Sequence, residues 1–337
     1  MKIEYENIIS VENLLLAWEE FLKGKRNRGD VQEFSFRLAD NILSLRQDLK
    51  TLTYNHGSYQ SFSISDPKPR IIHKAPVRDK LLHHAIHRIL YPFFEKRFVN
   101  DSYSCRIGKG THKAADRFQK FFWKVSKNNT KTCWVLKCDI KKFFASIDQE
   151  ILMKIFKKHI SNEDIVWLIN RIVGSFSSTK PGKGLPLGNL TSQLLVNIYM
   201  NEFDQFVKHK LKQKYYIRYA DDFVFLSENK SQFEEMIPQI EKFLSDKLKL
   251  QLHPNKVYIK TFASGVDFLG WVHFPDHRVL RTATKRKMLR KLKEDEVKPE
   301  TVASYLGMLK HGNTNKLKAE VVANLGYNGK YDKISFI

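Results

Sequence analysis

Residues 215–227, YYIRYADDFVFLS, place two adjacent aspartates inside a run that is otherwise apolar and aromatic. Apolar residues on both sides of a short polar centre predict a β-hairpin whose turn carries Asp221 and Asp222. Two carboxylates at a turn with apolar walls are costly unless a positive charge lies beside them. A divalent cation is the simplest compensation, and Mg²⁺ prefers a few carboxylates completed by substrate phosphates. The alternative is an ordinary charged turn.

A third carboxylate fits the same interpretation. The segment WVLKCDIKKFFASID, residues 134–148, places Asp139 at the end of an apolar strand. If this strand lies beside the hairpin, Asp139 and Asp221 can hold two metal ions about 3.5–4 Å apart, a spacing that suits in-line phosphoryl transfer. Such chemistry depends mainly on positioning and electrostatics, so it needs carboxylates and cations more than a protein nucleophile.

The charge balance points to a polyanionic partner. The chain has 58 Lys and Arg against 36 Asp and Glu, a formal charge of +22, which favours nucleic acid over a merely basic soluble protein. Its three cysteines form no Cys-x-x-Cys pair, which argues for a reducing compartment and against a zinc site. The sequence contains no run of 18 apolar residues, so we expect no membrane span. The polar start MKIEYENIIS is unlike a signal peptide. We therefore expect a cytoplasmic protein.

The order of elements suggests an α+β fold with antiparallel strands in the middle of the chain. We expect helices over residues 1–60, 149–173, 194–207, 230–248 and from 281 onward, extended segments at 60–72, a strand at 132–140, a loop at 180–193 and a strand pair near 256–274. The basic helix that begins near residue 281 is expected to follow a nucleic-acid backbone. His83, His84 and His87 are expected on a polar helix face, although a metal site is an alternative.

These motifs together resemble a reverse transcriptase of the bacterial group II intron-like lineage. YADD at 219–222 resembles the catalytic hairpin of the family, DIKKFFASID its first metal-binding motif and GLPLGNLTSQLLVNIY the motif between them. PNKVYIK and VDFLGW follow where the family has its palm lysine and primer-grip hairpin. DPKPRIIHKAPVRDKLLHHAIHRIL and DSYSCRIGKGTHKA resemble its fingers motifs. The resemblance covers about residues 11–325.

The resemblance implies a role for each matching residue. Asp139, Asp221 and the carbonyl of Ile140 would hold two Mg²⁺ ions, for which Mn²⁺ can substitute, with help from Asp222. Phe144 would be the steric gate against ribonucleotides, the alternative being a core phenylalanine. Further positions that the family assigns are Lys68, Arg70 and Arg106 for the triphosphate, Leu187, Gly188 and Gln193 for the nucleotide, Lys256 as proton donor to pyrophosphate, and Phe268, Leu269, Gly270 and Trp271 for the primer grip.

One departure from the common family pattern concerns fidelity. Leu187 stands where most relatives have a Gln that contacts the nucleotide, and Gln193 stands in place of a Pro. This pattern resembles the reverse transcriptases of diversity-generating retroelements, which copy a template RNA with errors at adenines. An apolar Leu187 removes a polar contact with the nucleotide, so we expect weaker discrimination between bases. Defence-associated reverse transcriptases share this lineage, and the sequence leaves that alternative open.

The resemblance implies a right-hand polymerase. We expect N-terminal helices and fingers at 1–130, a palm with an antiparallel sheet at 131–275 that includes a fingers segment at about 150–185, and a short helical thumb at 276–337. The expected partners are an RNA template that is a dedicated structured or non-coding RNA, a primer with its nascent cDNA, deoxynucleotides and an accessory protein, without a membrane. An alternative of another class is a catalytically idle RNA-binding scaffold.

Overall fold

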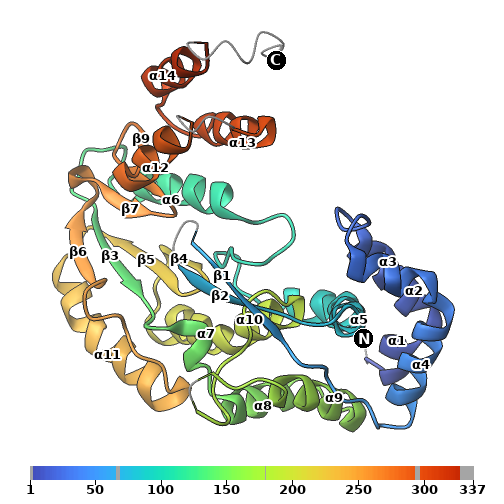
Figure 1. Cartoon of the computed structure of the whole chain (residues 1–337). Helices are drawn as coiled ribbons and strands as arrows, with labels where there is room; N and C mark the ends of the chain where they lie inside the picture. The colour runs from blue at the N-terminus through green and yellow to red at the C-terminus, as the bar shows by residue number, and fades with distance from the viewer. Residues whose placement is uncertain (1–2, 66–68, 179, 293–296, 327–337) are drawn as a thin grey trace. The chain divides into compact units, whose positions relative to one another are not determined.

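The computed structural model describes residues 3–65, 69–178, 180–292 and 297–326 and shows a mixed α+β protein (Figure 1). The helices are α1 (Tyr5–Ile9), α2 (Val11–Leu22), α3 (Gly29–Phe36), α4 (Leu38–Lys50), α5 (Val77–Glu95), α6 (Thr111–Val125), α7 (Phe143–Ser146), α8 (Gln149–Lys157), α9 (Glu163–Gly174), α10 (Leu190–Gln205), α11 (Ser231–Leu248), α12 (Thr282–Leu292), α13 (Pro299–Leu309) and α14 (Asn315–Gly326). The strands are β1 (Gln60–Ile64), β2 (Arg70–Lys74), β3 (Trp134–Asp139), β4 (Tyr216–Tyr219), β5 (Asp222–Ser227), β6 (Tyr258–Thr261), β7 (Val266–Phe268), β8 (Trp271–His273) and β9 (Arg278–Leu280).

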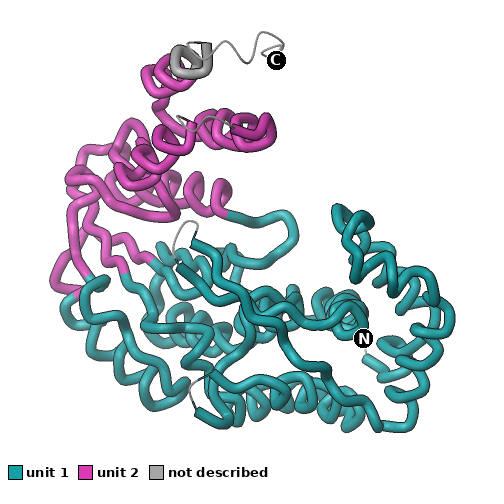
Figure 2. The backbone as a smooth tube through the Cα atoms, in the orientation of Figure 1, with its two compact units in different colours: residues 1–110, 138–223, 234–257 teal, residues 111–137, 224–233, 258–337 magenta. Residues whose placement is uncertain are grey.

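The chain forms two compact units, each made of several segments (Figure 2). Unit 1 comprises residues 1–110, 138–223 and 234–257, and unit 2 comprises the remaining residues 111–137, 224–233 and 258–337. The division passes through β3 and β5, so these strands contribute residues to both units. The boundaries predicted for fingers, palm and thumb follow other criteria and stay a prediction.

The first helices of unit 1 form as their apolar spacing predicts. The hydroxyl of Ser10 accepts a hydrogen bond from the backbone N–H of Asn13, which caps the first turn of α2. Leu14, Trp18 and Phe21 then recur at helical spacing and are buried. Helix α2 packs against the long helix α5, and α5 packs in turn against α10. This apolar core holds α10, whose first turn contains Gln193 and which closely follows Leu187 and Gly188 in the sequence. These three residues, predicted to bind the nucleotide, are called the nucleotide motif below.

The central sheet has the strand order β4-β5-β3-β6. Strands β3 and β6 are antiparallel, with Trp134 opposite Thr261 and Lys137 opposite Tyr258. The four middle residues of β3 and of β5 are buried, which agrees with their nearly continuous apolar sequence. The expected strands at 132–140 and in the hairpin are confirmed. Strands β1 and β2 form a separate antiparallel hairpin in the segment predicted to be extended.

Three local expectations were wrong. The helix predicted over 149–173 is two helices, because the polar segment 158–162 separates α8 from α9. Helix α10 begins at Leu190 rather than at 194, so the expected loop is shorter. The strand pair near 256–274 is divided: β6 joins the central sheet, whereas β7 and β8 form a hairpin that continues to β9.

Unit 2 has its own apolar core. Trp271 of β8 and Leu280 of β9 are buried together with Met288 and Leu292 of α12 and Val302 of α13. Helix α12 also packs against α14. The basic residues of α12 therefore share a helix with two core side chains, and its apolar face is buried as the sequence periodicity requires. None of the helices in the described part of the chain is long and apolar enough to cross a membrane.

Candidate active site

The hairpin of β4 and β5 places its aspartates as the sequence predicts, with one difference. Two residues, Ala220 and Asp221, connect the strands, and Asp222 is already the first residue of β5. A two-residue connection makes the strands antiparallel, and its favoured turns need a positive φ at the first position. Ala220 meets that need with φ of 55° although it is not a glycine. The turn is therefore held by its surroundings.

Backbone hydrogen bonds bring Asp139 to this turn. The N–H of Ile140 donates to the carbonyl of Asp221 at 3.1 Å. On the other side, the N–H of His253 donates to the carbonyl of Asp139 at 2.7 Å, and Ile140 forms an antiparallel bridge with Leu252. The end of β3 thus lies between the turn with Asp221 and the segment that carries Lys256. The predicted approach of Asp139 to Asp221 is present in the structure.

The electrostatics of the pair show two acidic groups in a partly buried site. Burial raises the pKa of Asp221, and the Asp139 carboxylate raises it further, while the charges of Lys256 and Arg70 act in the opposite direction. The ammonium of Lys256 donates to Oδ1 of Asp139 at 2.8 Å. A bound cation would relieve the repulsion that raises the pKa of Asp221.

These donors fit Mg²⁺ rather than a closed metal site. Asp139 and Asp221 offer hard carboxylate oxygens, which this ion prefers, and substrate phosphates would complete its coordination. In the part of the chain that the structure describes, no group of three or more His, Cys, Asp or Glu side chains could hold a metal. Ile140, the third predicted ligand, is held in place by its N–H bond to Asp221.

The nucleotide motif is joined to strand β2. The N–H of His73 donates to the carbonyl of Leu187 at 3.0 Å, and the side chain of Asn189 donates to the carbonyl of His73 at 3.2 Å. Gly188 has φ of 107°, and a Cβ there would lie 2.9 Å from the side chain of Ile72. Only glycine fits this close approach. Arg70 begins β2, so this contact links it to the loop with Leu187 and Gly188.

Two further side chains that are predicted to contact the nucleotide, Phe144 and Gln193, lie on helices. Phe144 lies in the short helix α7, half-buried, in an edge contact with Phe143, and its carbonyl accepts from the N–H of Leu185. The gate and the core phenylalanine both stay open as interpretations of this half-buried side chain. Gln193 lies in the first turn of α10, where its carbonyl accepts a hydrogen bond from the side chain of Asn197. Their roles in nucleotide binding stay predictions.

The structure contradicts the predicted contact of Arg106 with the triphosphate. Its guanidinium donates to Glu95 through Nε and Nη2 and to the carbonyls of Val99 and Ser102 through Nη1. The side chain is only 4% exposed. These partners use its donors to hold one loop, so Arg106 is a structural residue in place of the predicted triphosphate contact. Lys68, the other fingers candidate, lies outside the described residues.

The predicted primer grip is a tight β-hairpin. Phe268 and Trp271 pair across β7 and β8, and the two residues between them, Leu269 and Gly270, both have positive φ. The rings of Phe268 and Trp271 are buried, so they fix the hairpin from inside. Leu269 and Gly270 at the tip are partly exposed and are the pair that a primer could contact.

The histidines of α5 do not form the expected polar face. His83 is buried, its Nδ1 lies 2.6 Å from the hydroxyl of Thr191 and its Nε2 lies 3.3 Å from His56. Burial lowers the pKa of His83 to about 3 and those of His84 and His87 to about 4. His83 therefore belongs to the packing between α5 and α10, whereas His84 lies against Phe21 of α2 and His87 stacks on Tyr91 of its own helix.

Sequence reasoning missed one buried ion pair beside the hairpin. Arg218 of β4 and Asp204 of α10 are 1% and 0% exposed, and two guanidinium–carboxylate bonds join them. The sequence does contain a sign of this pair. An arginine between Ile217 and Tyr219 in an apolar strand needs a buried partner of opposite charge.

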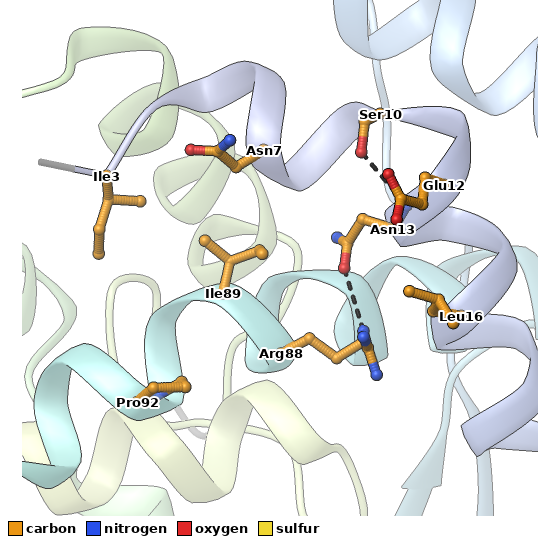
Figure 3. A pocket seen from close by; sticks show the side chains of 9 residues that line it. All are labelled: Ile3, Asn7, Ser10, Glu12, Asn13, Leu16, Arg88, Ile89 and Pro92. Atoms are coloured by element: carbon orange, nitrogen blue, oxygen red, sulfur yellow. Dashed lines mark hydrogen bonds between the residues drawn. The ribbon is translucent and has the colours of Figure 1, made fainter. Parts of the chain in front are cut away.

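A separate pocket of about 540 Å³ lies among α1, α2 and α5 (Figure 3). Ile3, Leu16 and Ile89 give it an apolar lining, and the guanidinium of Arg88 bonds to the side-chain oxygen of Asn13 at one side. No residue of the predicted site lines this pocket. The candidate active site is therefore distinct from it.

The hairpin with Asp221 and Asp222 is held against the end of β3, where Asp139 lies, and the loop with Leu187 and Gly188 is joined to β2. This arrangement is the one that the sequence predicts for a nucleic-acid polymerase. Residues 64–273 match the family described as reverse transcriptase (RNA-dependent DNA polymerase). The chain belongs to this family. The match spans the hairpin, the end of β3, the nucleotide loop and the β7–β8 hairpin.

Curated relatives agree with the family. Protein YkfC of Escherichia coli K12 is 26% identical over 295 residues, which cover 75% of each chain. The group II intron-encoded protein LtrA of Lactococcus lactis subsp. cremoris is 23% identical over 79% of this chain, which spans about half (54%) of the length of LtrA. These relatives support the predicted bacterial lineage.

A solved structure shows the same fold. An apo telomerase from Candida tropicalis, truncated from its C-terminal domain, superposes with a TM-score of 0.51 at 14% identity. The likeness covers 72% of this chain and 60% of the telomerase chain. It is a likeness of fold alone, and with the family match it confirms the expected right-hand polymerase class.

Proposed function

We propose that this chain is a Mg²⁺-dependent reverse transcriptase that copies a dedicated RNA with frequent errors, as the polymerase of a diversity-generating retroelement. The observation that carries the polymerase mechanism is the pairing of Asp139 with Asp221. The Ile140–Asp221 backbone bond holds the two carboxylates on adjacent elements, and burial, together with repulsion from Asp139, raises the pKa of Asp221. A site with this charge is prepared for cations.

In the proposed chemistry the primer 3′-hydroxyl loses its proton to solvent, and its oxygen bonds to the α-phosphorus of a deoxynucleotide. The bond from that phosphorus to the oxygen that bridges the α- and β-phosphates breaks, which releases pyrophosphate. Two Mg²⁺ ions, held by Asp139 and Asp221 with the carbonyl of Ile140 and the assistance of Asp222, would activate the primer hydroxyl and neutralise the charge of the phosphates. Lys256 would act as the general acid that donates a proton from Nζ to the leaving pyrophosphate. Its bond to Asp139 keeps the ammonium within reach of the reacting groups.

Selection of the nucleotide would rest on two side chains in unit 1. Phe144, half-buried on α7, would exclude a ribose 2′-hydroxyl by its bulk. Leu187 offers no side-chain hydrogen bond, and its backbone carbonyl is already used by His73. A site that lacks a polar contact with the nucleotide discriminates less strongly between similar substrates. This argument supports error-prone copying.

The proposed partners are an RNA template, a primer that becomes the cDNA, deoxynucleotides and an accessory protein. The formal charge of +22 supports a polyanionic partner. In unit 2, the basic helix α12 turns two side chains, Met288 and Leu292, into the core, which is consistent with solvent-facing lysines and arginines that contact phosphates.

Sequencing of the RNA and DNA that copurify with the wild-type protein tests this proposal, with Asp221→Asn as the control. One enriched RNA, with antisense cDNA found only in the wild type and errors concentrated at adenines, is the expected result. Faithful or repetitive cDNA would contradict the retroelement role and favour phage defence. An enriched RNA without cDNA in either sample, together with an inactive purified enzyme, would favour an RNA-binding scaffold.

A further inference from the structure

We propose that Arg218 is a positioning residue for the reaction: it holds the catalytic turn through the carbonyl of Ala220, with Asp204 as its buried counter-ion. The inference rests on the proposed polymerase function. It concerns a residue that lies three positions before Asp221 and has no exposure from which to contact a substrate.

The guanidinium of Arg218 uses all of its donors on protein groups. Nε donates to Oδ1 of Asp204 at 2.7 Å, and Nη2 donates to Oδ2 at 2.6 Å and to the Ser102 hydroxyl at 3.0 Å. Nη1 donates to the carbonyl of Ala220 at 3.1 Å and reaches Oδ1 of Asn197 at 3.5 Å. Five N–H groups in a rigid planar fork therefore meet five acceptors.

The backbone of Arg218 is fixed as firmly as its side chain. Its N–H donates to the carbonyl of Asp101 at 3.0 Å, and its carbonyl accepts from Tyr103 at 2.9 Å. The last residues of β4 are therefore attached both to the 101–103 segment and, through Asp204, to α10. A lysine has a single ammonium and cannot reproduce the planar fork.

The Ala220 contact gives this ion pair a purpose beyond stability. A well-packed apolar pair is often as stable as a buried ion pair, so stability alone does not account for Arg218 and Asp204. Ala220, by contrast, adopts φ of 55°, a conformation that persists only where the surroundings impose it. Arg218 binds the carbonyl of this residue, and the N–H of Ile140 binds the carbonyl of the next. Both carbonyls of the turn are thus held.

The consequence is a fixed direction for the Asp221 carboxylate. If Arg218 is lost, the Ala220 peptide can rotate toward ordinary backbone angles, and Asp221 turns away from Asp139. Metal binding should suffer more than binding of the RNA–DNA hybrid, because the carboxylates hold the ions while other surfaces hold the hybrid. The expected signature is a rate that is reduced most at low Mg²⁺ concentration and that recovers partly at high Mg²⁺ concentration.

The test compares Arg218→Lys with Tyr216→Phe in single-nucleotide primer extension across a Mg²⁺ titration. Tyr216 donates to the same Asp204 oxygen at 2.7 Å. Its phenylalanine variant therefore disturbs the buried ion pair but leaves the bond from Arg218 to the carbonyl of Ala220 in place. We expect Arg218→Lys to raise the half-saturating Mg²⁺ concentration about fivefold or more and to lower kcat about tenfold, whereas Tyr216→Phe lowers the melting temperature alone.

Each outcome decides a different claim. Unchanged Mg²⁺ dependence in folded Arg218→Lys, or an equal change in Tyr216→Phe, would overturn the positioning role while the polymerase stands. An inactive wild type would overturn the proposed function and this inference with it. If Arg218→Lys does not fold, Asp204→Asn replaces it, because it keeps the volume and weakens the hold on Arg218; normal Mg²⁺ dependence in that variant would likewise overturn the inference.

Discussion

Replacement of Lys256 by methionine separates a catalytic role from a structural one. The ammonium of Lys256 bonds to Asp139 at 2.8 Å, and the two side chains are 40% and 16% exposed. Ion pairs with this degree of exposure stabilise a protein by about 0.2–1 kcal/mol, because solvent screens them. Methionine keeps an unbranched chain of similar length, so the melting temperature should fall by only about 1–3 °C.

The effect on rate should be far larger. A positioned general acid typically contributes about 10²–10⁴-fold. A 100-fold loss of kcat corresponds to about 2.7 kcal/mol, which exceeds the whole expected change in stability. We therefore expect kcat to fall at least 100-fold, with a small change in KM for the deoxynucleotide, if Lys256 protonates pyrophosphate.

The assay is rapid-quench incorporation of one deoxynucleotide at saturating Mg²⁺, beside thermal unfolding. Lys158→Met is the matched control, since Lys158 also forms an ion pair, with Glu202 at 3.1 Å, in the same unit but outside the site. The reasoning is refuted if Lys256→Met keeps a kcat within about threefold of the wild type. A loss shared with Lys158→Met would refute it too.

Three further results are expected. Phe144→Ala should admit ribonucleotides, seen as a lower ratio of deoxynucleotide to ribonucleotide kcat/KM; an unchanged ratio would mean that the gate lies elsewhere. Leu187→Gln should lower the error frequency in sequenced cDNA, and an unaltered error spectrum would remove the argument from that side chain. Because the pKa of folded Asp221 is raised, metal-free wild type should lose stability as the pH rises above 3.8 through the raised value. Asp221→Asn lacks this loss, so its advantage in urea unfolding should grow over that window, and a constant difference would contradict the assignment.

The sequence could predict the hairpin and the place of Asp139 at a strand end because both depend on local patterns, whereas the approach of Asp139 to Asp221 was expected only on the condition that the two strands are neighbours. A short polar centre between apolar runs has few alternatives to a turn, and an aspartate that follows an apolar run marks the end of a buried strand. The register of neighbouring strands is a different matter. Strand β6 pairs with β3, about 120 residues earlier, and no local signal in 256–274 distinguishes it from the β7–β8 hairpin.

The missed features depend on partners distant in sequence. The role of Arg106 follows from Glu95 and two carbonyls, so a basic residue in a family motif could not be told from a phosphate ligand. The start of α10 at Leu190 follows from the extended Asn189 and the preceding Gly188, which read equally well as continued loop. His83 is buried by its packing between α5 and α10, which a helical stripe alone does not reveal.

Primer extension by the wild type and by Asp221→Asn tests the central claim most directly. The assay uses purified protein, an RNA template with a DNA primer, deoxynucleotides and Mg²⁺, with hybrid affinity measured in parallel. The wild type should extend the primer, while Asp221→Asn should bind the hybrid within about twofold of the wild type and extend nothing. Extension by Asp221→Asn at the wild-type rate, or a folded wild type that extends with neither Mg²⁺ nor Mn²⁺, would contradict the account.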